Sequence, residues 1–169
     1  ALGLFYLGSL LPEFKESARW RNTGLRILLA QLERHVRPDG VYFEQSTYYH
    51  RYTTDFYLHL WLMLSANGET PSSNLTAKLK LLLDHLMYIT RPDGSMPLFG
   101  DDDGGRFVPF DNKPTNDARS TLASAAVLFR RSDYKFVSRT VSPETLWLLG
   151  PQAVNHYEVL SPKEPDLTS

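Results

Sequence analysis

Cysteine is absent from the 169-residue sequence, which excludes disulfide bonds and zinc sites built on thiolates. Neither charge sign is in surplus, because 18 Lys and Arg residues face 19 Asp and Glu residues, for a formal net charge of −1. This balance argues against a nucleic-acid binder that relies on overall attraction, although a local basic cluster remains able to hold an anionic ligand. No apolar run is long enough to predict a membrane span, and no signal peptide is recognisable.

A four-residue motif occurs twice and is the most informative feature that the sequence contains. Arg37-Pro38-Asp39-Gly40 recurs as Arg91-Pro92-Asp93-Gly94, with an offset of 54 residues between positions 37 and 91. Each copy follows a Leu-rich stretch with helical spacing and precedes a short extended segment. A repeat of this length matches a helical hairpin and its connection, the unit of stacked helix-pair folds. We therefore expect both turns on one rim, with the polar residues after them converging.

Hydrophobic periodicity predicts four or five helices arranged in hairpins and no alternation of strands and helices. Pro12 is expected as the first residue of a helix that extends to about Val36. Gly24 is expected to weaken this helix slightly. Further helices are expected at residues 48–66, with Ser46 or Thr47 as N-cap, and at 74–91, 118–129 and 143–149, with 153–160 as a strand or an extended tail. The apolar stripe expected on the helix at 74–91 is Leu75, Leu79, Leu82, Leu83, Leu86 and Met87. The segment 94–114 is rich in Gly, Pro and Asp and is expected to be a long irregular loop, which is often functional. This pattern favours an all-α fold of antiparallel helix pairs.

The densest group of polar and aromatic side chains directly follows the first turn. Tyr48 and Tyr52 are four residues apart, so they are expected to share one helix face. Tyr49 is followed by His50 and Arg51. A neighbouring cation lowers the pKa of a phenol from its usual value near ~10, so a tyrosine of this group is a candidate proton-transfer residue. The alternative is that these side chains only pack and form structural hydrogen bonds.

Acidic residues in the long loop suggest further interpretations. Asp101–Asp103 lie among glycines, a composition that suits Ca²⁺, but the spacing of a calcium loop with its terminal Glu is missing. A solvated turn is therefore the alternative. Another interpretation pairs Glu44 with Asp101 or Asp102 across a cleft, as the two carboxylates of a glycoside hydrolase. The other histidines lie apart in the sequence and show no metal-ligand spacing.

The segment from Pro38 to His50 resembles the heparinase II/III and alginate lyase superfamily of polysaccharide lyases. The residues that carry the resemblance here are Pro38-Asp39-Gly40, Glu44-Gln45-Ser46 and Tyr49-His50. The resemblance extends to about residue 150, and its later part is similar to versions found with bacterial exopolysaccharide genes. The outer residues that carry it are Leu10-Leu11-Pro12-Glu13-Phe14-Lys15, Trp20, Gln31-Leu32-Glu33, Asp93-Gly94, Pro97, Phe99-Gly100-Asp101 and Trp147-Leu148-Leu149-Gly150.

This resemblance implies a domain organisation. Residues 1–150 would be the C-terminal part of an incomplete (α/α) toroid, and residues 151–169 an extended tail or linker towards β-domains. The family's Asn-His pair, which neutralises the uronate carboxylate, is expected before Ala1. The resemblance therefore implies a piece of a longer bacterial protein, periplasmic or secreted, and a chain that is inactive alone.

The resemblance also implies β-elimination on a uronic-acid polysaccharide, with an acidic polysaccharide or oligosaccharide as partner and no cofactor. A metal in the β-domains or at Asp101–Asp103 is left open. Tyr49 matches the family's proton-transfer tyrosine, with Tyr52 as the fallback if the register differs. The predicted catalytic residues are Tyr49 and His50, and the predicted substrate-binding residues are Glu44, Gln45, Arg51, Tyr52 and Asp101. A carboxylate-pair hydrolase and a non-catalytic carbohydrate-binding helical module remain the alternatives.

Overall fold

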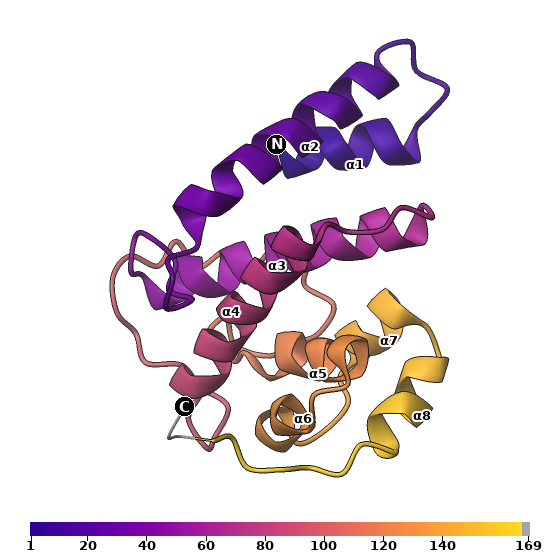
Figure 1. The fold of residues 1–169 in the computed structure, drawn as a ribbon. Helices are drawn as coiled ribbons and strands as arrows, with labels where there is room; N and C mark the ends of the chain where they lie inside the picture. The colour runs from indigo at the N-terminus through magenta and orange to yellow at the C-terminus, as the bar shows by residue number, and fades with distance from the viewer. Residues whose placement is uncertain (167–169) are drawn as a thin grey trace.

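The chain folds into helices, as the periodicity predicts. The computed structural model describes residues 1–166, which form eight helices and no β-strand beyond two isolated bridges. The helices, labelled in Figure 1, are α1 Leu2–Leu10, α2 Ser17–His35, α3 Thr47–Ala66, α4 Ser73–Ile89, α5 Arg119–Phe129, α6 Ser132–Ser138, α7 Pro143–Leu149 and α8 Gln152–Glu158. The predicted all-α fold is confirmed.

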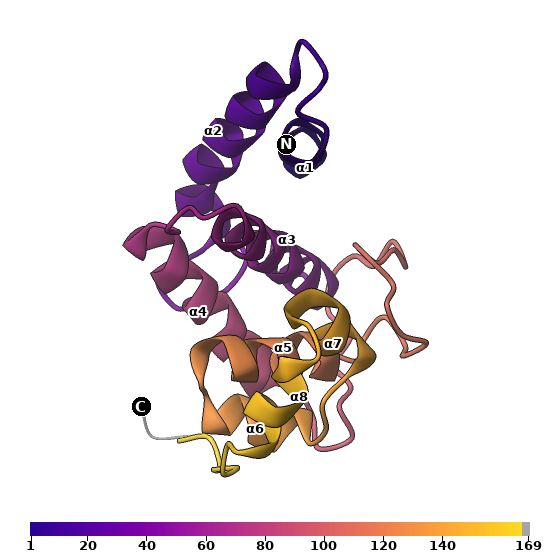
Figure 2. The ribbon, with the colours of Figure 1, turned by 90° about the vertical axis from the view of Figure 1, so that its right-hand side faces the viewer.

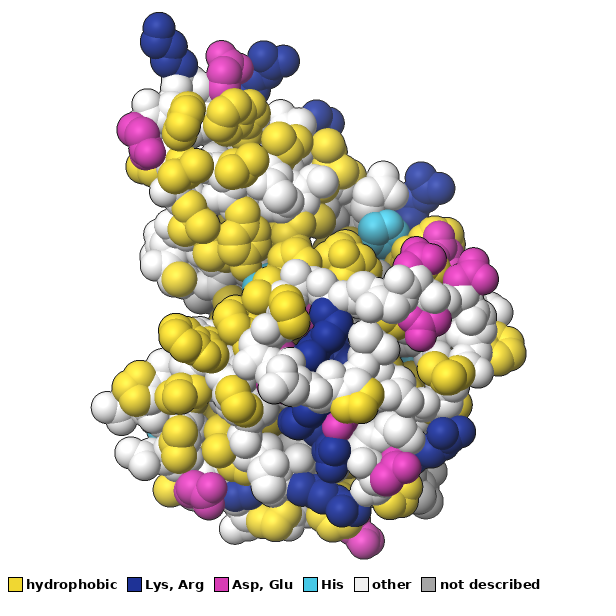
Figure 3. All heavy atoms as spheres, turned by 180° about the vertical axis from the view of Figure 1, so that it is seen from behind, with side chains coloured by type: hydrophobic (Ala, Val, Ile, Leu, Met, Phe, Trp, Pro, Cys, Tyr) yellow, Lys and Arg dark blue, Asp and Glu magenta, His cyan; other side chains and the backbone are white. Residues whose placement is uncertain are grey.

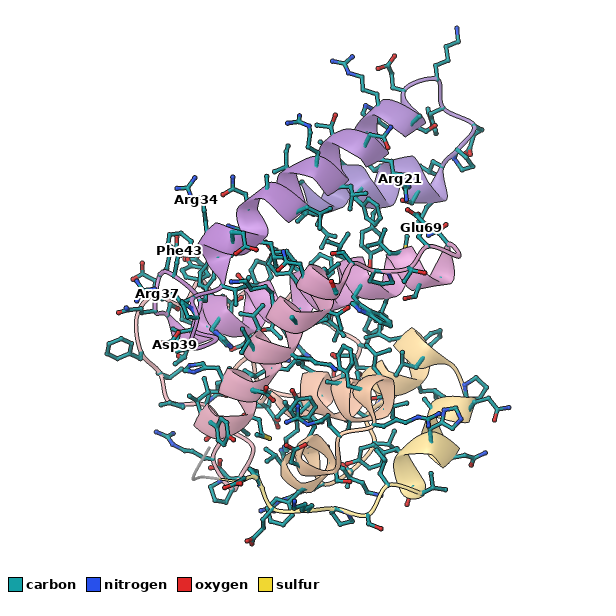
Figure 4. All side chains as sticks on the ribbon, viewed as in Figure 1. Arg21, Arg34, Arg37, Asp39, Phe43 and Glu69 are labelled. Carbon is teal, nitrogen blue, oxygen red and sulfur yellow. The ribbon has the colours of Figure 1, made fainter. Side chains whose placement is uncertain are left out.

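Helices α1 and α2 form a hairpin that projects from the rest of the molecule (Figures 1 and 2). The two helices come close at Gly24, where an added Cβ would lie 2.6 Å from the carbonyl oxygen of Ala1. Gly24, which the sequence suggests only as a weak point of the helix, thus has a packing role. The hairpin is joined to α3 by a hydrogen bond of 2.7 Å between the Tyr6 hydroxyl and His59 Nδ1. Arg21 also pairs with Glu69 beyond α3, and both are labelled in Figure 4.

The hydrophobic core centres on α4 and α5. The predicted leucine stripe of α4 is confirmed, because its members are fully buried: Leu75, Leu79, Leu82, Leu83, Leu86 and Met87. Helix α5 is surrounded by other helices, and every residue from Ser120 to Ala126 is buried. Small side chains suit this position because they let neighbouring helices approach closely. Figure 2 shows α5 between α4 and the C-terminal helices.

The sequence prediction is wrong for the start of α2 and for the structure of residues 152–158. Helix α2 begins at Ser17 and not at Pro12, because a turn precedes it in which the Ser17 hydroxyl donates to the Pro12 carbonyl. Residues 152–158 form helix α8 and not a strand or extended tail. Ala153 and Tyr157 are one helical turn apart and both buried, and the Tyr157 hydroxyl lies 2.8 Å from Ser138 Oγ. Tertiary packing thus stabilises a short helix whose sequence signal is weak. Residues 167–169 of the predicted tail lie outside the described residues.

The repeated motif forms the same turn twice. In each copy the Gly N–H donates to the Arg carbonyl, at 3.0 Å in residues 37–40 and 2.8 Å in residues 91–94. In each copy the Asp carboxylate accepts from the backbone N–H two residues further on, at 3.1 Å and 2.9 Å. Identical sequence thus produces identical local structure at the ends of α2 and α4. The segment after each helix therefore begins from the same turn conformation.

Hydrophobic side chains gather on the face seen in Figure 3, over the α1–α2 hairpin and the adjoining part of the molecule. A cleft on the chain surface is lined by side chains from several helices, among them Tyr6, Met63, Leu128 and Trp147. Trp147 is 73% exposed. Within residues 1–166, no helix combines the length and the apolar character that crossing a membrane requires.

Candidate active site

The segments that follow the two turns meet at the N-terminus of α3. The backbone N–H of Thr47 donates to the Phe99 carbonyl at 3.0 Å, and the Thr47 hydroxyl donates to the Pro97 carbonyl at 2.7 Å. The Ser46 hydroxyl donates to the Asp101 carbonyl at 2.6 Å. These bonds attach the long loop between α4 and α5 to the start of α3. The predicted convergence of the two repeat segments is confirmed.

Ser46 is the N-cap of α3, one of the two caps that the sequence predicts. Its Oγ accepts the backbone N–H of Tyr49 at 3.2 Å while donating its own proton to Asp101. The loop reaches Ser46 at Gly100, whose φ of +75° is the left-handed conformation that glycine favours. A Cβ on Gly100 would lie 2.9 Å from Ser46 Cα. One hydroxyl therefore positions both the helix that carries Tyr49 and the loop that carries the acidic residues.

The phenol of Tyr49 is hydrogen-bonded to the acidic loop. Its hydroxyl donates to Asp103 Oδ2 at 2.5 Å. This hydrogen bond, with desolvation and the negative charges of Asp103, Asp101 and Glu44, raises the pKa of Tyr49 to about 12. The lowered pKa expected from neighbouring cations is therefore wrong, because carboxylates and not cations surround the phenol. The phenol of Tyr49 is therefore protonated throughout the physiological pH range.

His50 lies inside the protein and not beside the phenol. It is 1% exposed, its Nδ1 accepts the Tyr42 backbone N–H at 3.2 Å, and its Nε2 lies 2.9 Å from the Leu82 carbonyl. Burial, with a smaller contribution from His85, lowers the pKa of His50 to about 4, so the ring is neutral at physiological pH. Both nitrogens of this neutral ring are engaged within the protein. His50 therefore links the start of α3 to Tyr42 and to Leu82 of α4, and its catalytic role stays a prediction.

Arg51 is also turned inward. It is 4% exposed, its Nη1 donates to the Thr115 carbonyl at 2.6 Å, and its Nε lies 3.8 Å from Asp55 Oδ2. The guanidinium therefore contacts the loop at Thr115 and is turned away from solvent, and its predicted role in substrate binding stays a prediction. The cause is helix geometry, because successive residues point about 100° apart.

The other predicted site residues lie at or near the surface. Glu44, Gln45 and Asp101 are exposed. Tyr48 and Tyr52 share one helix face as predicted, with nearly parallel rings whose centroids are 6.0 Å apart. Tyr48 is buried and Tyr52 is half-buried, so Tyr52 is the ring of this pair that is more open to a ligand.

The acidic residues of the loop separate rather than converge. Asp102 Oδ1 accepts the Gly104 backbone N–H at 2.7 Å, while Asp103 faces Tyr49. Within residues 1–166, no group of three or more His, Asp or Glu side chains is arranged to hold a metal ion. The geometry of the described loop therefore offers no ligand set for the Ca²⁺ site that the composition suggests.

Glu144 on α7 is a buried acid that sequence reasoning missed. It is 6% exposed, and burial, followed by the negative charge of Asp55, raises its pKa to about 8. Arg51 and Arg106 oppose this rise, but Arg51 pairs with Asp55, and Arg106 Nη2 pairs with Asp111 Oδ1 at 2.9 Å. In the sequence, Glu144 looks like an ordinary first-turn acid after the cap at Ser142. Its burial depends on tertiary contacts of α7, which the sequence pattern does not reveal.

Comparisons with known proteins identify a matching family profile and similar sequences. The chain matches the family profile described as Heparinase II/III N-terminus over residues 1–116. It is 33% identical over 99 residues to the heparin-sulfate lyase of Pedobacter heparinus, and 33% identical over 104 residues to that of Bacteroides thetaiotaomicron. These alignments cover 57% and 56% of this chain but 15% of each relative. The chain thus spans a small part of the length of the curated relatives that it matches.

Solved structures of heparinase III and heparan sulfate lyase are also similar to this chain. The crystal structure of heparinase III matches with a TM-score of 0.63 at 25% identity, covering 81% of this chain and 21% of that chain. Heparan sulfate lyase HepC from Pedobacter heparinus matches with a TM-score of 0.61 at 27% identity, covering 82% of this chain and 21% of that chain. The helical hairpins form part of an incomplete (α/α) toroid, as predicted. Since the family profile also covers more than half of the sequence, the chain belongs to the heparinase II/III family.

Proposed function

We propose that this chain supplies the tyrosine-bearing part of the toroid in a polysaccharide lyase that cleaves a uronic-acid-containing polysaccharide by β-elimination. The observation that carries the proposal is the position of Tyr49. Its phenol stands at the capped start of α3, beside the loop that the second repeat delivers, and it donates to Asp103. The lyases named above, which this chain resembles in sequence and in fold, support the same reaction class.

In β-elimination a base removes the proton at C5 of the uronate, beside the carboxylate. The electron pair left on C5 forms the C4–C5 double bond as the C4–O bond breaks, and the departing oxygen takes up a proton. Tyr49 is suited to give that proton, because its raised pKa keeps the phenol protonated. Neutralisation of the uronate carboxylate stabilises the developing negative charge. The Asn-His pair that the resemblance implies for this task remains a prediction.

Asp103 and Ser46 prepare Tyr49 for this role. Asp103 accepts the phenolic hydrogen bond and so directs the hydroxyl along the rim where the loop meets α3. Ser46 fixes the backbone N–H of Tyr49 and the Asp101 carbonyl of the loop. The hydroxyl exchanges the Asp103 carboxylate for the leaving oxygen when it donates its proton. Such preorganisation reduces the rearrangement that the reaction needs.

For the substrate, we propose an acidic glycosaminoglycan. The relatives that support this class are described as heparin-sulfate and heparan sulfate lyases, all longer than this chain. Alginate and bacterial exopolysaccharides, which the motif resemblance suggests, belong in the same substrate panel. A periplasmic or secreted location is part of this proposal, because polymers of this kind lie outside the cytoplasm.

The experiment is the replacement Tyr49→Phe in the full-length gene product that contains this chain. We expect turnover to fall at least a hundredfold, the lower range for loss of a general acid, with oligosaccharide affinity nearly unchanged. Tyr88→Phe is the matched control, because Tyr88 is an exposed tyrosine on α4 that takes no part in the site. Near-normal activity of Tyr49→Phe would refute the assignment, and loss of activity in Tyr52→Phe alone would indicate the other register.

The product distinguishes the proposed lyase from the alternatives. A lyase generates an unsaturated uronate that absorbs in the ultraviolet, while a hydrolase using Glu44 with Asp101 or Asp102 generates reducing ends without that absorbance. A carbohydrate-binding module would bind oligosaccharide and form neither product. Mass spectrometry of the digest provides an independent check, because hydrolysis adds the mass of water and elimination does not.

A further inference from the structure

Phe43 is held in an exposed position by a stack of aromatic rings at the base of α2. It is 40% exposed, and its ring lies parallel to that of His35, with centroids 5.8 Å apart and an interplanar angle of 6°. His35 Nδ1 is hydrogen-bonded to the Tyr57 hydroxyl at 2.9 Å, and Tyr42 contacts Phe43 edge-on. The backbone N–H of Phe43 donates to the His35 carbonyl at 3.1 Å. Several contacts therefore immobilise a ring that solvent still reaches.

Two arginines flank this ring. Arg37 Nη2 donates to the Phe43 carbonyl at 3.2 Å, and Arg34 lies on the last turn of α2, directly before His35. Both arginines are exposed, and neither forms an ion pair with a carboxylate within residues 1–166. Figure 4 shows Arg34, Phe43 and Arg37 together on one side of the molecule, where α2 ends. Their charges are thus available to an anionic ligand.

Glu44 is an electrostatic neighbour of both this group and Tyr49. Glu44 follows Phe43 in the chain, and its carboxylate acts electrostatically on both His35 and Tyr49. The surroundings of Tyr49 are acidic, because Asp101, Asp103 and Glu44 all act on its phenol. The exposed arginines therefore offer an acidic polymer an attraction that the carboxylates around Tyr49 do not. The surface beside Phe43 is therefore more favourable for anionic sugars than the surface around Tyr49.

We propose that Phe43, Arg34 and Arg37 form a sugar-binding subsite for an acidic polysaccharide. The ring of Phe43 stacks against the apolar face of one sugar, and the two guanidinium groups bind its carboxylate or sulfate. This inference rests on the proposed function for the identity of the polymer. It adds a subsite that holds the polysaccharide on this part of the protein surface and fixes the direction of the polysaccharide relative to Tyr49.

The second copy of the repeat provides the control. Arg91 occupies the position of Arg37 in the second turn and is also exposed, whereas the position of Phe43 is taken by Pro97. The second turn thus presents a comparable cation with a proline at the position that Phe43 occupies in the first. Arg91→Gln removes the same charge in the same local structure, so it separates an effect of the subsite from an effect of net charge.

The test is calorimetric titration of the 169-residue chain with a heparan sulfate hexasaccharide. We expect Phe43→Ala, and separately the double variant Arg34→Gln/Arg37→Gln, to raise Kd about tenfold. The double variant is also expected to weaken the salt dependence of binding, since it removes two charges that salt screens. Phe43→Leu keeps apolar bulk without the ring and should resemble Phe43→Ala. Arg91→Gln should change Kd less than twofold.

Unchanged Kd in Phe43→Ala and in the double variant, with thermal unfolding showing folded protein, would overturn the subsite. An equal effect of Arg91→Gln would also overturn it, since attraction would then be unspecific. A hyaluronan hexasaccharide, which carries carboxylates but no sulfates, shows which anion the arginines select. The full-length enzyme separates this inference from the proposed function. Loss of the subsite raises KM with kcat nearly unchanged, whereas absence of lyase product with intact hexasaccharide binding rejects the function and keeps the subsite.

Discussion

Glu144 makes stability depend on pH in a direction opposite to that of most acidic residues. Its pKa rises from 4.5 to about 8 in the folded chain, because the carboxyl is buried and Asp55 lies close to it. Between these values the folded state keeps a proton that the unfolded chain releases. Stability from this group is therefore fully present below pH 4.5 and is lost as pH rises through about 8.

The loss of folding stability can be estimated from the same two pKa values of Glu144. A rise from 4.5 to about 8 corresponds to roughly 5 kcal/mol when the carboxyl ionises completely. Side-chain relaxation and water entry reduce such penalties, so we expect a loss of about 2–4 kcal/mol over the whole range, of which at most about 2 kcal/mol falls above pH 6.5. Arg51 and Arg106 do not prevent the loss, because each is already paired with another carboxylate.

The assay is urea unfolding of the 169-residue chain between pH 6.5 and pH 9, followed by circular dichroism. Histidines contribute in the opposite direction, because desolvation lowers the pKa of His35, His50, His59 and His85, but their contribution is complete above their usual value of 6.5. In this window the wild-type chain should lose stability, and Glu144→Gln should not. Glu13→Gln, at an exposed position, is the control. Equal pH dependence of the wild-type chain and Glu144→Gln would refute the reasoning.

Three further predictions concern the site and the core. Asp103→Asn should shift the alkaline limb of the kcat/KM profile to lower pH, because a neutral amide replaces the carboxylate that raises the pKa of Tyr49; an unchanged profile would contradict this role. Gly100→Ala should cost about 1–3 kcal/mol in urea unfolding and lower kcat, since its Cβ meets Ser46 at positive φ; wild-type stability and kcat together would count against the described loop attachment. Leu82→Ala should cost about 2–5 kcal/mol in the same unfolding assay, because Leu82 is fully buried; a cost below about 1 kcal/mol would show that α4 packs differently.

Local sequence signals predicted the fold well where they were strong. The leucine spacing of α4 identified its buried face, and the capping residue Ser46 located the start of α3. The repeated turn predicted that two segments 54 positions apart converge, and they do. Weak signals failed, as at α8, where the contact of Tyr157 with Ser138 stabilises a helix that the seven residues alone do not indicate.

The site was predicted in outline but not in its electrostatics. Adjacency in the sequence suggested that His50 and Arg51 act on Tyr49, yet helix geometry turns both inward, and the phenol contacts Asp103, 54 positions away. No local pattern reveals such a partner, because it depends on how the loop folds back onto α3. The burial of Glu144 has the same origin, since α7 reaches Arg51 only in the folded chain. The role of Tyr49 in turnover remains a prediction.

The most direct test of the central claim is the ultraviolet absorbance of unsaturated uronate during digestion by the full-length gene product. The panel contains heparan sulfate, hyaluronan, alginate and bacterial exopolysaccharides, each with wild-type protein and Tyr49→Phe. We predict rising absorbance with a uronate polymer for the wild-type protein and a flat trace for Tyr49→Phe. A flat trace for the wild-type protein together with new reducing ends would contradict the account, and so would an undiminished signal from Tyr49→Phe.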